Sequence, residues 1–232
     1  MNNCPHYKRA CQVLANCCNK WVDCRLCHND QYQDHEIDRF KITTMRCNHC
    51  STEQPCNKEC IECNQQMADY FCKVCNLFDD DGAKKKIFHC DDCGICRVGG
   101  REAVFHCDTC GGCYANALKG NHKCIANVVH QECTICLEPM FASLDGMRVM
   151  SCGHALHLSC AMKAVQHSHF NCPICRAPMY KLNSDIISDT SNIISDLFNF
   201  EFDFDFADED EPDEDEETED EETDEDEPDE ED

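Results

Sequence analysis

Cysteine and histidine recur along this chain in short groups whose spacing suits metal coordination. Of its 232 residues, 26 are Cys, far above ordinary usage. Most of the histidines in the first 160 residues lie within two residues of a cysteine, and imidazole is a zinc ligand that a disulfide framework would not need. The opening residues carry no secretory signal and no stretch could cross a membrane, so we expect a cytoplasmic or nuclear protein with reduced thiols. The pattern therefore predicts zinc, with a disulfide scaffold or iron–sulfur binding as less favoured alternatives.

The most specific spacing lies between residues 133 and 175, where it reads C-x2-C-x15-C-x-H-x2-H-x2-C-x11-C-x2-C. The eight candidate ligands are Cys133, Cys136, Cys152, His154, His157, Cys160, Cys172 and Cys175. This spacing resembles the RING finger, in which ligand pairs alternate between two zinc ions. The resemblance implies one site of Cys133, Cys136, His157 and Cys160, and a second of Cys152, His154, Cys172 and Cys175. Sequential zinc fingers and a PHD-type domain are the competing interpretations, and two histidines in the fourth and fifth positions disfavour the second.

An internal repeat dominates the segment from 72 to 124. The quartet His89, Cys90, Cys93 and Cys96 recurs seventeen residues later as His106, Cys107, Cys110 and Cys113. The pair Cys72 and Cys75 precedes the two quartets, and the pair His122 and Cys124 follows them. These twelve ligands suffice for three zinc sites if each quartet is shared by two successive metals, which would give a rod held by zinc. The spacing leaves open which members of a quartet serve which metal.

The first segment is less regular but also resolves into six pairs, enough for three sites. The pairs are Cys4/His6, Cys17/Cys18, Cys24/Cys27, His28/His35, Cys47/Cys50 and Cys60/Cys63. Cys11, Cys56 and His49 are then surplus, and we expect them to bind no metal. The apolar cluster beneath these sites is expected to contain Trp21, Leu26, Ile37, Phe40 and Ile42.

Charge is distributed very unevenly along the chain. Of the 46 acidic residues, 24 fall between Glu201 and Asp232, where there is no Lys or Arg. The remaining 200 residues are nearly neutral and lack the basic surface of a nucleic-acid reader, so no nucleic-acid partner is expected. The acidic segment is predicted to be disordered. Before it, Phe198 to Phe206 alternate with Asn or acids, as a partner-docking strand or a disordered segment would.

Taken together, residues 4 to 176 resemble the RING finger and CHY zinc finger proteins, the Pirh2-like ubiquitin ligases. The matching stretches are CPHYKRAC, CCNKWVDCRLCHND, DHEIDRFK, YFCKVCNLFDDD and FHCDDCGICRVG. Those ligases usually continue into a C-terminal zinc ribbon, whereas here Cys175 is the last cysteine. Substrate recruitment through that ribbon therefore cannot be carried over.

The expected fold is a series of small zinc-dependent α+β modules holding eight Zn2+ ions. We place a CHY-type zinc finger at 1–67, a CTCHY-type zinc rod at 68–125, a linker at 126–132, a RING finger cross-brace at 133–176, a linker with a short helix at 177–200, and a disordered acidic tail at 201–232.

The resemblance implies a RING-type ubiquitin ligase whose partners are a ubiquitin-conjugating enzyme, ubiquitin and a protein substrate. Ile135 and Pro173 lie where this family contacts the conjugating enzyme, and Arg176 occupies the position of a linchpin that bridges ubiquitin and that enzyme. No catalytic nucleophile is expected on this chain. Many RING fingers have Trp where Ala164 stands, which predicts weak docking.

Two other functions remain open from the sequence. One is a non-catalytic adaptor whose N-terminal half docks a protein partner, which Ala164 favours and Arg176 opposes. The other is a binder of basic proteins that uses the acidic tail.

Overall fold

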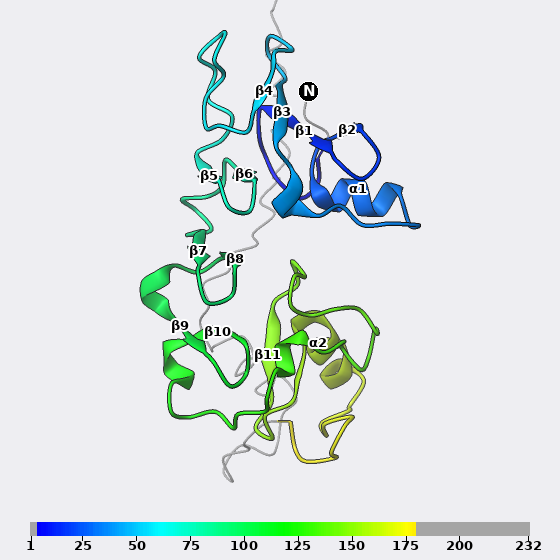
Figure 1. The fold of residues 1–232 in the computed structure, drawn as a ribbon. Helices are drawn as coiled ribbons and strands as arrows, with labels where there is room; N and C mark the ends of the chain where they lie inside the picture. The colour runs from blue at the N-terminus through cyan, green and yellow to red at the C-terminus, as the bar shows by residue number, and fades with distance from the viewer. Residues whose placement is uncertain (1–3, 180–232) are drawn as a thin grey trace, which may run out of the picture.

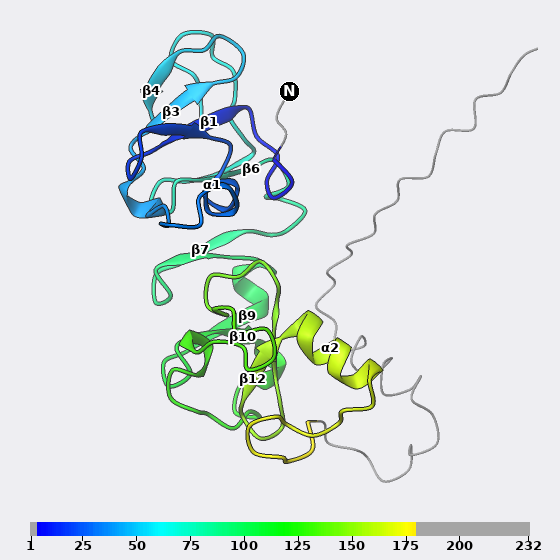
Figure 2. The ribbon, with the colours of Figure 1, turned by 90° about the vertical axis from the view of Figure 1, so that its right-hand side faces the viewer.

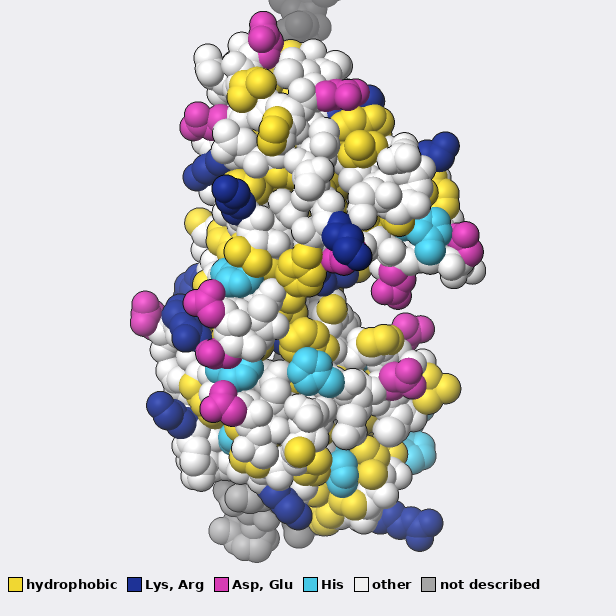
Figure 3. All heavy atoms as spheres, in the orientation of Figure 1, with side chains coloured by type: hydrophobic (Ala, Val, Ile, Leu, Met, Phe, Trp, Pro, Cys, Tyr) yellow, Lys and Arg dark blue, Asp and Glu magenta, His cyan; other side chains and the backbone are white. Residues whose placement is uncertain are grey.

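The computed structural model describes residues 4–179, which follow an arc with a zinc-finger-sized unit at each end (Figure 1). An N-terminal unit of residues 11–55 occupies one end, three hairpins between residues 70 and 115 run along one side, and a unit of residues 147–166 occupies the other end (Figure 2). The helix expected in 177–200, the acidic tail and the Phe-rich segment lie outside the described residues and stay predictions. In the space-filling view a recess separates the two ends on the side of α1 (Figure 3).

A four-stranded antiparallel sheet forms the N-terminal unit, in the order β2-β1-β3-β4. The strands are β1 (Cys11–Ala15), β2 (Lys20–Val22), β3 (Thr44–Cys47) and β4 (Glu53–Pro55). Helix α1 (Arg25–Gln31) and the 3-10 turn η1 (Arg39–Lys41) connect β2 to β3. The Cys24 sulfur accepts a hydrogen bond from the Cys27 N–H and so caps the N-terminus of α1. A candidate metal ligand therefore also satisfies a backbone donor in the first turn of the helix.

Each of the next three modules is a two-stranded antiparallel hairpin. They pair β5 (Tyr70–Cys72) with β6 (Leu77–Asp79), β7 (Phe88–Cys90) with β8 (Ile95–Arg97), and β9 (Val104–Cys107) with β10 (Gly112–Ala115). The 3-10 turns η2 (Arg101–Ala103) and η3 (Asn116–Leu118) flank the third hairpin. An isolated hairpin is at best marginally stable in water, so each needs a neighbour or a metal.

The C-terminal unit has one hairpin and one helix. Strand β11 (Met147–Val149) pairs with β12 (Ala155–His157), which leads directly into α2 (Leu158–Gln166). The 3-10 turn η4 (Val128–His130) precedes this unit inside the segment expected to be a linker, and its Val128 and Val129 are buried. Within residues 4–179, no helix is long and apolar enough to span a membrane.

The buried apolar residues form three clusters of unequal size. One joins the N-terminal sheet to the first hairpin and contains Met45, Met67 and Phe78. Another joins the third hairpin to the C-terminal unit, through Tyr114, Val129 and their neighbours. The middle hairpin has only a small cluster of Ile95 with Cys72 and Cys75. The molecule therefore consists of two bodies, each with its own core, connected by a hairpin that has very little core.

The expected apolar cluster of the first segment was partly wrong. Ile37 and Ile42 are buried as expected, but Phe40 is 53% exposed. Asp38 accepts a hydrogen bond from the Phe40 N–H and starts the short turn η1, which holds the phenyl ring on the solvent side. Trp21 is half-buried, and the Arg46 guanidinium covers its ring at 4.1 Å.

Candidate metal centres and docking surface

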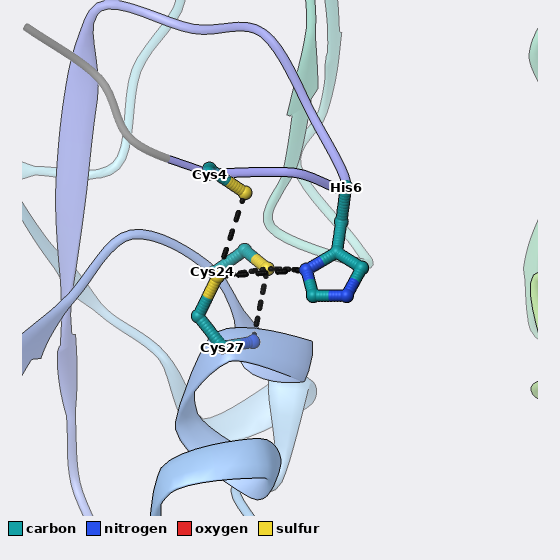
Figure 4. Close-up of side chains that lie close together, drawn as sticks. All are labelled: Cys4, His6, Cys24 and Cys27. Carbon is teal, nitrogen blue, oxygen red and sulfur yellow. Dashed lines mark hydrogen bonds between the residues drawn. The ribbon is translucent and has the colours of Figure 1, made fainter.

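The sequence pairs of the first segment converge into three groups of four. Cys4 and His6 meet Cys24 and Cys27 where the chain crosses the start of α1 (Figure 4). The other two groups are Cys17, Cys18, His28 and His35, and Cys47, Cys50, Cys60 and Cys63. In each group the candidate ligand atoms all lie within 4.8 Å of one another. The first two groups use alternating pairs, whereas the third uses two pairs adjacent in sequence.

Along the hairpins, each quartet is divided between two groups in the same way. One group contains Cys72, Cys75, His89 and Cys96, and the next contains Cys90, Cys93, His106 and Cys113. The first and last members of a quartet therefore complete the preceding group, while the two middle cysteines begin the next one. In the third hairpin His122 Nε2 lies 3.5 Å from Cys110 and 3.3 Å from Cys124, and the Cys107 and Cys124 sulfurs are 3.9 Å apart.

The eight candidates in the C-terminal unit form two interlocked groups. His157 lies 3.3 Å from Cys136, and the Cys160 thiol is hydrogen-bonded to Cys136 and Cys133. His154 Nδ1 lies 3.5 Å from Cys152 and 3.6 Å from Cys172, and Cys152 contacts Cys175. The two groups alternate along the chain, so β11, β12 and α2 are enclosed between them.

The spacing of the donor atoms fits tetrahedral zinc. With Zn–S bonds of about 2.3 Å, a tetrahedral ion places its sulfurs about 3.8 Å apart. The sulfurs of Cys47 and Cys63 are 3.8 Å apart, and those of Cys93 and Cys113 are 3.6 Å apart. All 26 cysteines are free of disulfides, and these separations are far longer than an S–S bond of about 2.05 Å. The donor sets therefore suit zinc.

Several candidate histidines have their second ring nitrogen turned to a carboxylate or carbonyl. His89 and His106 face the sulfurs with Nδ1, and their Nε2 atoms lie 3.8 Å from Asp91 and Asp108 respectively. His122 does the reverse, with Nε2 toward the sulfurs and Nδ1 2.9 Å from the Leu118 carbonyl. Such outer partners fix the ring orientation and tautomer of a metal-bound imidazole.

The electrostatics of the groups favour a cation. A hydrogen bond from the Cys113 thiol, aided by the Arg97 guanidinium, lowers the pKa of Cys93 to about 4. The same shared proton, together with burial, raises the pKa of Cys113. Neighbouring thiols thus cannot all ionise together unless a positive charge lies between them, which is what a bound Zn2+ supplies.

Two loops of the C-terminal unit present the proposed docking residues to solvent. Ile135 and Ile174 are each 44% exposed, and Pro173 and Arg176 are also exposed. Leu137 and Arg176 follow the second cysteine of their loops with φ of 64° and 61°. Their N–H groups donate to the carbonyls of Cys133 and Cys172 over 2.7 and 2.8 Å. The two loops therefore have the same backbone turn.

The surplus residues behave differently from the candidate ligands. Cys11 is fully buried in β1 and Cys56 is half-buried, and neither belongs to a group described above. Burial raises the pKa of Cys11 to about 12 and that of Cys56 to about 11. A buried, protonated thiol is a poor nucleophile.

Sequence reasoning missed the arginines beside the sulfurs. Arg97 Nη2 donates to the Cys93 sulfur at 3.7 Å, and Arg101 Nη1 donates to the Cys90 sulfur at 4.0 Å. The only signal was their position shortly after the first quartet, where a basic residue can reach back to a thiolate. These donors offset part of the negative charge of a cysteine-rich metal centre.

Comparison with known proteins agrees with this geometry. The model of the CHY zinc finger matches residues 4–70, and the model of the RING finger domain matches residues 131–176. The rice E3 ubiquitin-protein ligase SRFP1 is 42% identical over 86% of this chain and 76% of its own length. The Arabidopsis thaliana E3 ubiquitin-protein ligase RZFP34 is 39% identical over 82% of this chain, which spans 65% of that protein. The Arabidopsis zinc finger protein BRUTUS is 41% identical over 74% of this chain, but the match covers only 14% of BRUTUS.

Proposed function

We propose a mechanism that starts from one premise: this chain belongs to the family of proteins that combine a CHY zinc finger with a RING finger, and it is a RING-type E3 ubiquitin transferase. In this mechanism the RING binds a conjugating enzyme that carries ubiquitin as a thioester. A substrate lysine then attacks the thioester carbonyl, the conjugating enzyme's sulfur leaves, and ubiquitin becomes amide-linked to the lysine. The contribution of the RING is to hold the thioester in a reactive geometry.

The observation that carries this proposal is the pair of matching RING loops. Ile135 and Pro173 expose apolar surface on the two loops, and Arg176 lies directly after the second loop. An exposed apolar patch suits docking of a protein partner. A planar guanidinium with five N–H donors suits a bridge between the conjugating enzyme and ubiquitin.

We further propose that eight zinc ions hold the described fold together. Each would be bound by four side chains, most often three thiolates and one imidazole, a closed set that leaves no position for a reactive water. Zinc would therefore stabilise structure, and the transfer chemistry would occur at the conjugating enzyme's thioester.

A covalent intermediate on this chain has little support among its thiols. The two cysteines left outside the eight groups are Cys11 and Cys56, and both have raised pKa values. A ligase that accepts ubiquitin on its own cysteine needs an accessible thiolate. The transfer is therefore direct, from the conjugating enzyme to the lysine.

Arg176→Ala tests this mechanism most directly. The substitution removes no zinc ligand. Alanine and arginine have a similar energetic cost for the positive φ at this position, so zinc content and the circular dichroism spectrum should be unchanged. The rate at which a charged conjugating enzyme discharges ubiquitin to free lysine should fall about tenfold, the equivalent of about 1.4 kcal/mol of transition-state positioning. Arg176→Lys should not restore the rate, because an ammonium group lacks the planar fork.

Ile135→Ala is the complementary variant. It should weaken binding of the conjugating enzyme itself, which titration calorimetry would measure, and leave the zinc content intact. If Arg176→Ala discharged ubiquitin as fast as the parent, the linchpin role would be withdrawn. If the parent stimulated none of a broad panel of conjugating enzymes, a non-catalytic adaptor would become the better description.

A further inference from the structure

The middle hairpin is the weak point of the arc. Two bodies, each with its own apolar core, are joined through β7–β8, whose apolar cluster has three buried residues, Ile95, Cys72 and Cys75. Interfaces between domains allow relative motion unless they are large and hydrophobic. Two candidate metal groups also join this hairpin to its neighbours, and a direct contact between the RING and the CHY finger would add to their restraint on the orientation of the RING.

One loop of the RING supplies such a contact. The segment 139–146, between the second and third ligand positions, rises from the RING toward α1 (Figure 1). Its Phe141 side chain packs against both the RING core and the small cluster of the middle hairpin. The His130 ring stacks on the Phe141 ring, with centroids 4.1 Å apart. Phe141 is therefore an apolar residue common to the RING core and the cluster of the middle hairpin.

Two arginines on the N-terminal side bind this loop. Arg97 of β8 donates from Nη1 to the Phe141 carbonyl at 2.9 Å, and its guanidinium lies 4.7 Å from the Phe141 ring centroid. Arg25 of α1 donates from Nη2 to the Ala142 carbonyl at 2.9 Å. Adjacent carbonyls of one RING loop thus accept hydrogen bonds from the CHY finger and from the middle hairpin. Hydrogen bonds from charged donors are stronger than neutral ones.

The contact is bordered by open space on one side. A cavity of about 320 Å³ lies beside it, lined by Asp92, His106, Asp108, His130 and Phe141 among others. The second terminal nitrogen of the same guanidinium, Arg97 Nη2, donates to the Cys93 sulfur at 3.7 Å.

We propose that segment 139–146, which we name the RING latch, fixes the orientation of the RING relative to the CHY finger through Phe141, Arg97 and Arg25. The docking residues Ile135, Pro173 and Arg176 are not part of the latch and are exposed. A conjugating enzyme bound there would be held at a set place relative to a protein partner on the N-terminal half. This last consequence rests on the proposed function, whereas the latch itself does not.

Small-angle X-ray scattering of the full chain tests the latch. Arg25→Ala/Arg97→Ala and Phe141→Ala should each increase the radius of gyration and the maximum dimension, with zinc content unchanged by native mass spectrometry. Arg101→Ala and Leu144→Ala are matched controls: Arg101 donates to a sulfur near the same hairpin, and Leu144 is 55% exposed in the same loop. Both should scatter like the parent.

Scattering identical to the parent in both latch variants would overturn the proposal. If the arginine variant lost zinc, Phe141→Ala would decide the question, because Phe141 donates to no sulfur. Hydrogen exchange of the amides around Ala142 gives a second readout, and it should become faster in the latch variants only.

Activity assays separate the latch from the proposed function. Discharge to free lysine needs only the RING and should be unchanged in the latch variants, while the pattern of ubiquitin attached to lysines of the chain itself should shift. If the parent protein were inactive, the proposed function would be refuted. The scattering experiment would still test the latch, because it does not depend on activity.

Discussion

At the scale of single residues, one backbone feature recurs at the Cys-x-x-Cys turns. The residue after the second cysteine has positive φ at Ser51, Asn64, Gly111, Leu137 and Arg176, and its N–H donates to the carbonyl of the first cysteine. Only glycine and asparagine among these adopt that conformation at low cost. The ligand geometry therefore imposes a strained backbone at three positions, including the proposed linchpin.

The surplus thiols allow a prediction at this scale. Burial holds the pKa of Cys11 near 12 and that of Cys56 near 11, above the usual value of 9.0. Both thiols should therefore stay protonated at pH 8 and resist alkylation by iodoacetamide in the folded protein, although both should react after chelation in denaturant. Their contribution to stability is complete below pH 9 and is lost as pH rises toward 12. Peptide mapping by mass spectrometry gives the result.

Replacing these thiols should have little effect on function. Cys11→Ala and Cys56→Ala should keep full zinc content and normal discharge, at a cost of about 1 kcal/mol in stability from the lost buried atoms. Loss of discharge with full zinc content in either variant would point to a covalent step and contradict direct transfer.

At the scale of elements, the division of each quartet follows from hairpin geometry. In β7–β8, His89 and Cys96 are opposite each other in the antiparallel register, so both side chains lie on one face. His106 and Cys113 are opposite each other in β9–β10 in the same way. The two middle cysteines of each quartet lie in or beside the turn and reach the next group. Strand pairing thus decides which group each candidate ligand joins.

Cys113→Ala tests that division. The variant should free Cys90 and Cys93 for alkylation, because they share a group with Cys113, while Cys107 and Cys110 stay protected. The control variant Cys110→Ala should free Cys107 and Cys124 instead. Labelling of Cys107 and Cys110 in the Cys113→Ala protein would mean that the quartets are divided in the other way.

The sequence predicted part of this arrangement. Spacing alone predicted the pairs and the sharing of quartets, because two cysteines a few residues apart in one turn can bind the same metal ion. It left the assignment within a quartet open, since Cys90/Cys93 and Cys93/Cys96 have the same spacing. The exposed position of Phe40 was also missed, because hydrophobicity does not show that Asp38 turns the chain there.

At the scale of the whole molecule, we expect metal binding and folding to be coupled. Many of the candidate metal ligands belong to the apolar clusters, so we expect much of the folding free energy to come from the metal centres. A strong chelator should therefore unfold residues 4–176. Circular dichroism and native mass spectrometry should show loss of structure together with loss of about eight zinc ions per chain. A chain that stayed folded with about two zinc ions would contradict the assignment.

Acid should produce the same loss. Thiolates and neutral imidazoles bind zinc, and their protonated forms do not, so the affinity for zinc falls as pH falls.

The RING latch could not be predicted from the sequence. Phe141 lies in a fifteen-residue spacer with no repeat, and its partners Arg25 and Arg97 are 117 and 44 residues away from the carbonyls they bind.

Sharing of quartets along the hairpins makes the rod a linear chain of coupled units. Each quartet carries ligands of two adjacent metal centres. Binding of a metal at one centre therefore orders two of the four ligands of the next centre, as stacked repeats stabilise their neighbours. Metal uptake should then spread from an occupied position to the adjacent one. Metal loss should begin at an end of the series, where Cys124 is exposed, and not in its middle.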